Sequence, residues 1–297
     1  MVLEVIIINI IDYIKKHQNE TFKEFPMTEV DSLILSLLPY IDSTGIVPAF
    51  RKNKITIKET ATKISTKKEH DIFAKNTKKM LNIMSNTKRY SNALLYNYMK
   101  VVNNEMQFGA LTIKLDDKTT YIAYAGTDTS IIGWEEDFKM AYLYPGASQK
   151  YASIYLNKAL GIFDKNVIIG GHSKGGNLAI CAGMNAKWYL KPRIKAIYNF
   201  DGPGFLKEQI ESSLYKKIAS KVKLYVPESS IIGMILYHTN AYTVVKAKSF
   251  NIFQHDAFNW LCSESSLITS RLNKRSKKLE QRITEKLEKI PVEERLK

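Results

Sequence analysis

The segment Gly170-Gly171-His172-Ser173-Lys174-Gly175-Gly176-Asn177 decides the fold. It follows a short apolar run at 167–169, which indicates a strand, and precedes a run of apolar and small residues at 178–183, which indicates a helix. The segment contains the pattern G-x-S-x-G, in which a serine stands on a sharp turn between strand and helix. Glycines are needed two residues before and after the serine, because a Cβ there would strike neighbouring backbone. The pattern therefore predicts a nucleophile elbow with Ser173 as the nucleophile.

Two other interpretations of this segment are weaker. A tight structural turn would use the same glycines, but the strand before and the helix after favour serine catalysis. A phosphate-binding loop is disfavoured, because the segment lacks the Walker spacing of residues before Gly-Lys-Ser/Thr.

Strand and helix signals alternate on both sides of this segment. Alternating apolar residues at 107–115, a turn at 116–118 and β-formers at 119–125 predict a hairpin. The later pattern predicts helices at 149–160, 174–187 and 207–219, and strands at 167–170, 194–200, 222–226 and 242–245. Strands separated by helices form βαβ units. We therefore predict an α/β protein with the α/β-hydrolase fold, in which helices cover both faces of a mostly parallel sheet.

The flanking segments predict additional helices. Isoleucines recur at helical spacing near the N-terminus, and Thr28 can cap a second helix that Pro39 closes. The basic stretch at 58–100 is expected to be mostly helical. We divide the chain into an N-terminal helical region packed on the core (1–100), the α/β-hydrolase core (101–266) and a charged C-terminal helix on the surface (267–297).

Composition limits the function classes. With 44 basic and 29 acidic residues among 297, the net charge is +15, which we attribute to solvated faces rather than to a specific nucleic-acid site. Peripheral contact with an anionic membrane is a weaker expectation. Two cysteines and no C-x-x-C pattern give no reason to expect a disulfide framework, a metal or a cofactor. The apolar N-terminal run carries Glu4 and is shorter than the roughly 20 residues of a membrane span, so we expect a cytoplasmic protein.

A serine nucleophile needs a base, and the order Ser, acid, His along α/β-hydrolase chains leaves two candidates. His255 follows the last predicted strand and is favoured, whereas His238 is interpreted as a surface or supporting histidine. His172, next to Ser173, is interpreted as a packing residue.

The acid that orients the base should follow a strand between the serine and the histidine. Asp201 directly follows the strand at 194–200, and Glu228 follows the next strand. We prefer Asp201 and keep Glu228 as the alternative acid, while Asp256 is expected to cap a helix. The backbone amides of Lys174 and Thr127 are the expected oxyanion donors.

These segments together resemble the bacterial Mbeg-like group of α/β-hydrolases, which is distantly similar to the class 3 lipases. The resemblance covers most of the chain, and its most specific part is the glycine-rich turn with Lys174 and Asn177. The other matching segments are 28–48, 126–128, 133–138, 201–205, 227–233 and 254–256. The resemblance implies Ser173 as nucleophile and His255 as base, and the Asp-Gly-Pro-Gly-Phe segment favours Asp201. The lipase comparison instead implies an acid near Ser229 and Ser230, where no carboxylate stands.

Two positions depart from these patterns. Ala125 stands where relatives carry Arg before Gly-Thr, and Lys174 replaces an apolar residue common after the lipase serine. We therefore predict a serine hydrolase, esterase or lipase-like, that acts on a small-molecule or lipid ester through an acyl-enzyme, without carrying over lipase substrate preference. The alternative is a non-catalytic α/β-hydrolase-fold protein that contacts anionic lipid or nucleic acid through its basic surface.

Overall fold

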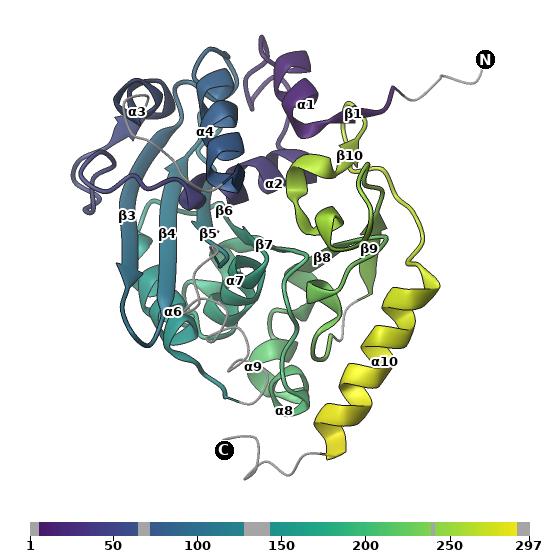
Figure 1. The fold of residues 1–297 in the computed structure, drawn as a ribbon. Helices are drawn as coiled ribbons and strands as arrows, with labels where there is room; N and C mark the ends of the chain where they lie inside the picture. The colour runs from purple at the N-terminus through teal and green to yellow at the C-terminus, as the bar shows by residue number, and fades with distance from the viewer. Residues whose placement is uncertain (1–5, 65–71, 128–142, 239–240, 290–297) are drawn as a thin grey trace.

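A central eight-stranded sheet organises the chain (Figure 1). The computed structural model describes residues 6–64, 72–127, 143–238 and 241–289. The strand order is β2-β3-β4-β5-β6-β7-β8-β9; β2 to β5 pair antiparallel, and β5 to β9 pair parallel. The strands are β2 (Ile55–Thr56), β3 (Leu94–Val102), β4 (Gln107–Lys114), β5 (Thr120–Tyr124), β6 (Val167–His172), β7 (Ile194–Phe200), β8 (Val222–Pro227) and β9 (Tyr242–Val245). This architecture confirms the predicted α/β fold.

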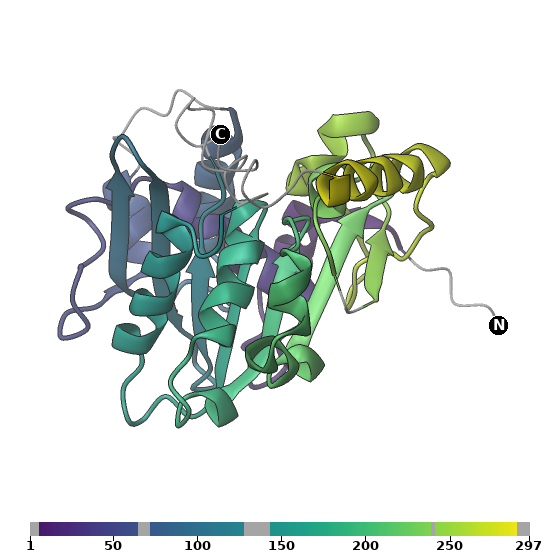
Figure 2. The ribbon, with the colours of Figure 1, turned by 90° about the horizontal axis from the view of Figure 1, so that it is seen from below.

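Helices cover both faces of this sheet (Figures 1 and 2). The first face packs against α6 (Ala147–Ala159), α7 (Lys174–Met184), α8 (Lys207–Glu211) and α9 (Ser213–Lys216). The opposite face packs against α1 (Ile10–Lys16), α2 (Glu29–Leu37), α3 (Ile57–Ile64) and α4 (Ile72–Met84). Two apolar cores therefore form, one on each side of the sheet.

Short elements complete the described chain. Strand β1 (Ile8–Asn9) pairs with β10 (Leu261–Cys262) in a separate two-stranded sheet, and α10 (Lys274–Lys289) lies at the edge of the molecule (Figure 1). The 3₁₀ turns are η1 (Leu38–Tyr40), η2 (Lys191–Arg193), η3 (Ala219–Lys221), η4 (Ile232–Met234), η5 (Asn251–His255) and η6 (Ala257–Asn259).

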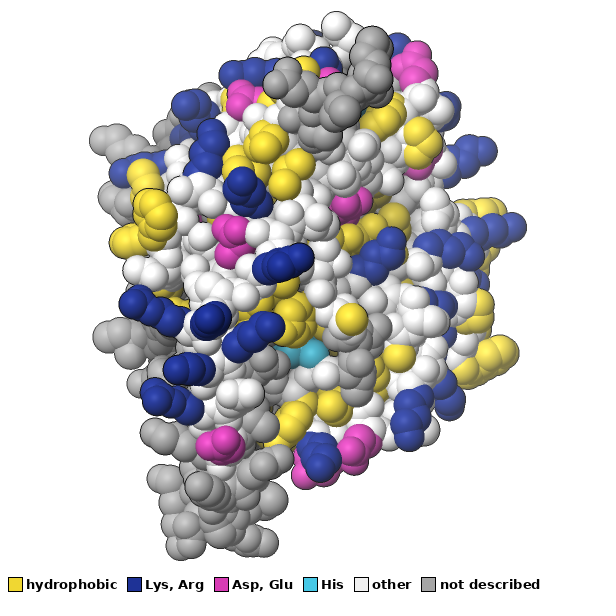
Figure 3. Space-filling view, turned by 90° about the vertical axis from the view of Figure 1, so that its right-hand side faces the viewer, with side chains coloured by type: hydrophobic (Ala, Val, Ile, Leu, Met, Phe, Trp, Pro, Cys, Tyr) yellow, Lys and Arg dark blue, Asp and Glu magenta, His cyan; other side chains and the backbone are white. Residues whose placement is uncertain are grey.

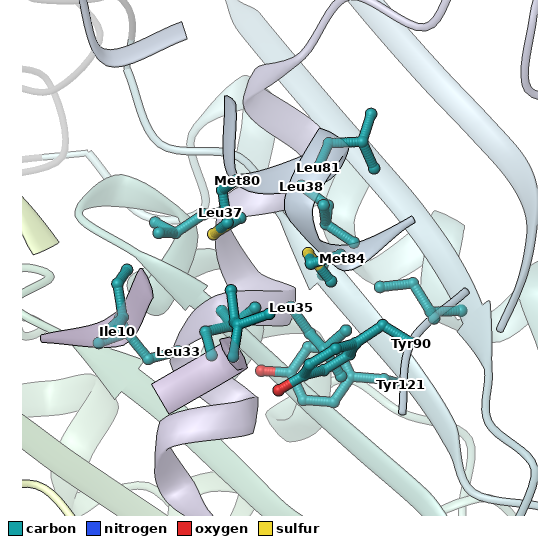
Figure 4. Packing of buried hydrophobic residues seen from close by; sticks show 14 of the residues in the cluster. Ile10, Leu33, Leu35, Leu37, Leu38, Met80, Leu81, Met84, Tyr90 and Tyr121 are labelled. Carbon is teal, nitrogen blue, oxygen red and sulfur yellow. The ribbon is translucent and has the colours of Figure 1, made fainter. Parts of the chain in front are cut away.

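The second helix forms as its sequence predicts. The Thr28 side chain accepts from the amides of Val30 and Asp31, while the Asp31 carboxylate accepts from the Thr28 amide, so the free amides of the first turn are satisfied. Its apolar residues meet those of α1 and α4, as labelled residues such as Leu33, Leu37 and Met84 show in Figure 4. This packing holds the N-terminal helices on the sheet.

A buried ion pair reinforces the same region. Asp31 and Arg89 have fully buried side chains, and Arg89 Nη2 lies 2.7 Å from Asp31 Oδ2. The hydroxyls of Tyr13 and Tyr90 also donate to this carboxylate. The Asp31 charge thus joins α1, α2 and the turn before β3.

Several predicted boundaries are wrong. The helical expectation for 58–100 fails at its end, where Leu94–Val102 forms β3. A bulge between Tyr96 and Met99, with Asn97 at φ 55°, breaks the alternation that would have marked a strand. The helix expected at 207–219 is interrupted because the Ser212 hydroxyl caps a new helix through the Tyr215 amide.

The C-terminal helix also begins later than expected. Bridges from Leu267 to Cys262 and from Thr269 to Val245 keep residues 267–269 extended, and α10 starts at Lys274. Strands β2 and β3 also make the first hundred residues part of the sheet, in addition to their helices. The division into three regions stays a prediction.

Candidate active site

Ser173 occupies the sharp turn between β6 and α7. Its backbone angles are φ 57° and ψ −137°, a region that residues with a side chain rarely adopt. The turn is so tight that a Cβ on Gly171 would lie 2.2 Å from the Gly175 carbonyl carbon, and a Cβ on Gly175 would lie 2.1 Å from the Tyr124 carbonyl oxygen. The glycines on both sides of the serine are therefore required by the backbone path.

Asp201 and His255 are joined across two distant segments. The Asp201 Oδ2 atom lies 2.7 Å from His255 Nδ1, and the aspartate is buried. The other carboxylate oxygen of Asp201 accepts from the Ser230 hydroxyl at 2.5 Å and from the Gly233 amide at 3.2 Å. A Cβ on Gly233 would lie 2.4 Å from that oxygen. The carboxylate is thus held so that one oxygen faces the imidazole.

Ser173 lies directly beside the loop that carries Asp201. Its amide donates to the carbonyl of Phe200, the residue before Asp201, at 2.9 Å. A Cβ on Gly202 would lie 2.2 Å from the Ser173 carbonyl oxygen. Within the part of the chain that the structure describes, no hydrogen bond joins the Ser173 hydroxyl to His255. Catalytic hydrogen bonds in enzymes often tighten only in the complex with substrate.

His172 connects the serine turn to the loop that carries His255. Its Nε2 atom lies 2.7 Å from the His255 carbonyl oxygen, and its Nδ1 lies 3.1 Å from the Tyr40 hydroxyl. The two histidine rings lie 4.7 Å apart, and the Phe73 ring stacks on His172. Burial, and then the nearby charge of His255, lower the pKa of His172 well below its ordinary value. The predicted packing residue therefore also makes polar contacts that hold the loop.

The other candidates have different partners. Glu228 accepts from the Ser270 hydroxyl, and Asp256 caps η6 by accepting from the Phe258 amide, as expected. His238 Nε2 lies 2.8 Å from the Gly233 carbonyl oxygen, and burial lowers the pKa of His238 to about 4. Of the two candidate acids, only Asp201 contacts His255 in the described part of the chain.

The loop after β5 lies against the serine. A Cβ on Gly126 would lie 2.9 Å from Ser173 Cβ and 2.0 Å from the Tyr40 hydroxyl, so only glycine fits there. Thr127 follows directly, and the amide of Lys174 begins α7 beside the serine. The resembling segment at 133–138 lies outside the described residues.

The side chains of Lys174 and Asn177 in the glycine-rich segment hold neighbouring backbone in place. The buried Lys174 Nζ donates to the Gln107 carbonyl at 2.9 Å. The Asn177 amide group donates to the carbonyls of Pro203 and Gly204, so it fixes the loop after Asp201. Their side chains thus point into the fold rather than toward a substrate.

Sequence reasoning missed several of these supporting residues. Ser230 and Gly233 fall inside a resembling segment, and their place after β8 was the available signal. Tyr40 comes from η1, far away in the sequence, and no local pattern marks it.

One face of the molecule is basic and partly apolar. On the face shown in Figure 3, a histidine side chain lies in a hollow beside hydrophobic side chains, and Lys and Arg outnumber Asp and Glu. Among the described residues, no group of His, Cys, Asp and Glu side chains could hold a metal ion. None of the described helices has the length and hydropathy needed to cross a membrane.

Comparison with known proteins gives one family match. The model of the family described as Mbeg1-like matches residues 84–297. No curated protein matches the chain.

The similar solved structures are lipases of low identity. M37 lipase is 16% identical, with a TM-score of 0.41 and 68% of each chain covered. The lipase from Rhizopus microsporus var. chinensis is 15% identical, with a TM-score of 0.38, covering 62% of this chain and 69% of that one. The native Rhizomucor miehei lipase propeptide complex is 16% identical, with a TM-score of 0.37 and 51% of this chain covered; the chain spans 56% of its length.

Proposed function

The chain belongs to the Mbeg1-like family, and from that premise we propose that it is a serine hydrolase that cleaves a carboxylic ester through Ser173, His255 and Asp201. The observation that carries the proposal is the 2.7 Å contact between Asp201 Oδ2 and His255 Nδ1, beside a serine with φ 57° on a strand-to-helix turn. A nucleophile elbow uses this backbone conformation to present the serine hydroxyl at the carboxyl edge of the sheet.

The proposed reaction has two halves. The Ser173 oxygen attacks the ester carbonyl while His255 Nε2 accepts its proton, and the tetrahedral oxyanion is held by the amides of Lys174 and Thr127. Collapse breaks the bond to the alcohol, which takes the proton from His255, and leaves an acyl group on Ser173. Water, deprotonated by His255, then attacks the acyl carbonyl. The bond to Ser173 breaks, the serine oxygen takes the proton back from His255, and the carboxylic acid leaves.

Asp201 supports the base in both halves. Its oxygen accepts a hydrogen bond from the protonated His255 Nδ1, which leaves Nε2 unprotonated toward the serine, and its charge stabilises the imidazolium that forms. The contacts from Ser230 and Gly233 to its other oxygen keep it in this orientation. Glu228 is engaged with Ser270 and is not assigned a role.

A fluorophosphonate probe tests this proposal directly. The probe should label the full-length protein, and mass spectrometry should place the adduct on Ser173. Ser173→Ala should remove the label and the hydrolysis of p-nitrophenyl butyrate, while Ser229→Ala serves as the matched control that keeps both. A folded wild-type protein that neither reacts with the probe nor hydrolyses short-chain and long-chain esters would instead support a non-catalytic binding protein.

A further inference from the structure

Two loops far from Ser173 expose large apolar side chains. One loop joins α6 to β6, and the other joins α7 to β7. Because β6 and β7 are parallel, and Ser173 and Asp201 follow their carboxyl ends, these loops lie at the opposite edge of the sheet. The exposed fractions are 72% for Ile162, 80% for Phe163, 83% for Trp188 and 42% for Tyr189.

Hydrogen bonds join the two loops into one surface. Arg193 Nη1 donates to the Gly161 carbonyl at 3.0 Å. The Asn157 side chain accepts from the Lys187 amide at 2.9 Å and donates to the Asn185 carbonyl at 3.1 Å. The Trp188 and Tyr189 rings pack edge to face, with centroids 5.7 Å apart. The aromatic side chains are therefore displayed from a fixed backbone.

Positive charge surrounds these apolar side chains. Burial, and then the charge of Lys217, lower the pKa of Lys191; burial, and then the charge of Lys195, lower the pKa of Lys221. Lys221 Nζ also donates to the Lys191 carbonyl at 2.6 Å, which brings η3 beside η2. Exposed lysines at positions 158, 165, 187, 195 and 217 complete the cluster.

The two loops themselves hold no exposed carboxylate. Asp164 is the one acidic residue in the sequence between 143 and 200, and its side chain is buried. It is paired with Arg51 at 2.8 Å and Lys114 at 3.3 Å. We call Ile162, Phe163, Trp188 and Tyr189, together with the lysines around them, the aromatic-basic surface.

We propose that the aromatic-basic surface docks this protein onto an anionic lipid membrane. Tryptophan and tyrosine favour the interface between lipid and water, and protruding Ile162 and Phe163 gain from leaving water for the acyl boundary. Lysines near an anionic leaflet are attracted by its surface potential. Nucleic acid would neutralise the lysines, but its phosphate backbone offers nothing apolar to cover Ile162 and Phe163.

The aromatic-basic surface and the proposed active site lie at opposite edges of the sheet. When it rests on a membrane, the edge of the sheet that carries Ser173 points away from the lipid. Docking would then hold the protein at the membrane while the site takes ester from the water. Loss of docking should therefore leave the hydrolysis of a soluble ester unchanged.

Co-sedimentation with vesicles tests the proposal. The full-length protein should bind vesicles of phosphatidylcholine mixed with phosphatidylserine, and bind pure phosphatidylcholine at least tenfold more weakly. The double variant Phe163→Ser, Trp188→Ala should weaken binding to the mixed vesicles by tenfold or more. Replacing Lys187, Lys195 or Lys217 singly with glutamine should weaken binding to the mixed vesicles by about fivefold each at low salt.

The tryptophan gives a second readout. Of the three tryptophans, Trp260 is fully buried and Trp134 lies outside the described residues. The Trp188→Phe variant therefore assigns the signal, because a blue shift of fluorescence on adding mixed vesicles that is lost in this variant would report Trp188 entering lipid. Trp188→Phe itself should keep most of the binding, since the ring remains apolar.

Control variants distinguish this surface from the exposed aromatic side chains elsewhere on the protein. Phe250→Ser, Phe253→Ser removes two exposed aromatic side chains near His255 and should leave vesicle binding intact. The proposal is overturned if that variant loses binding while Phe163→Ser, Trp188→Ala keeps it, or if neither vesicle binds. Binding of a single-stranded oligonucleotide that these lysine variants abolish, with vesicle binding unchanged, would also overturn it. Ester turnover in every variant reports the proposed hydrolase independently.

Discussion

His172 Nε2 and the carbonyl oxygen of His255 are 2.7 Å apart, so the residue before the proposed nucleophile holds the loop of the proposed base. A carbonyl oxygen only accepts, which means that Nε2 carries the proton. Nδ1 is then the acceptor for the Tyr40 hydroxyl at 3.1 Å. A neutral His172 therefore links η1, the serine turn and η5.

His172→Phe should slow catalysis without weakening substrate binding. The phenyl ring can keep the stacking on Phe73 but loses the hydrogen bond to His255, which leaves the imidazole less well positioned. We expect kcat to fall by about tenfold to a hundredfold, with KM nearly unchanged. Steady-state kinetics on p-nitrophenyl butyrate measures this. Phe73→Leu, which removes the stacking alone, is the control, and a normal kcat in His172→Phe would refute the positioning role.

The buried His172 and the half-buried His238 should make stability depend on pH. The pKa values of His172 and His238 are lowered in the folded protein, so between about pH 6.5 and 4 the unfolded chain binds more protons. The free energy of unfolding should be highest above pH 6.5 and should decrease as the pH drops. At pH 5.5 the decrease should be about 1 kcal/mol per histidine. Urea denaturation at pH 7.5 and 5.5 measures this decrease in the free energy of unfolding. The two pH values lie about one unit on either side of the ordinary histidine pKa.

A variant identifies the source of that loss. His238→Gln should show a smaller difference between the two pH values. Carboxyls such as Glu24, whose pKa is lowered to about 2, titrate below this window and should not contribute. Equal stability of the wild-type protein at both pH values would contradict the interpretation.

The sequence predicted the strands and the helix around Ser173 better than the elements near the chain ends. The hairpin before β6, the strand β6 and the helix α7 follow from short-range alternation and glycine spacing, which the backbone obeys locally. The Asn97 bulge hid β3, because a single residue at positive φ shifts which side chains face the core. Tyr40 could not be predicted, because its contact with His172 spans 132 residues and depends on how η1 packs under the sheet. Tyr40 also lies before the part of the chain that matches the family.

Asp201→Asn should abolish most of the proposed activity while Glu228→Gln does not. The amide would present the wrong hydrogen-bonding pattern to His255 Nδ1 and would not stabilise its cation, at a cost of about 10⁴-fold in kcat. The Glu228 carboxylate contacts Ser270 and not His255, so Glu228→Gln should change kcat less than about threefold. Ester kinetics on both variants, with folding checked by circular dichroism, decides between the two acids. The reverse result would transfer the role to Glu228.

Asp31→Ala should destabilise the protein far more than a surface pair does. Removing the carboxylate leaves the fully buried Arg89 without its charge partner and leaves the hydroxyls of Tyr13 and Tyr90 without their acceptor. Breaking one side of a buried pair costs about 3–5 kcal/mol. The matched control is Glu24→Ala, which breaks the exposed pair with Lys88 and should lower the free energy of unfolding far less. Urea denaturation at pH 7.5, about one unit above the histidine pKa, compares the two. A similar small loss in both variants would mean that packing, rather than the Asp31 charge, holds the N-terminal helices on the sheet.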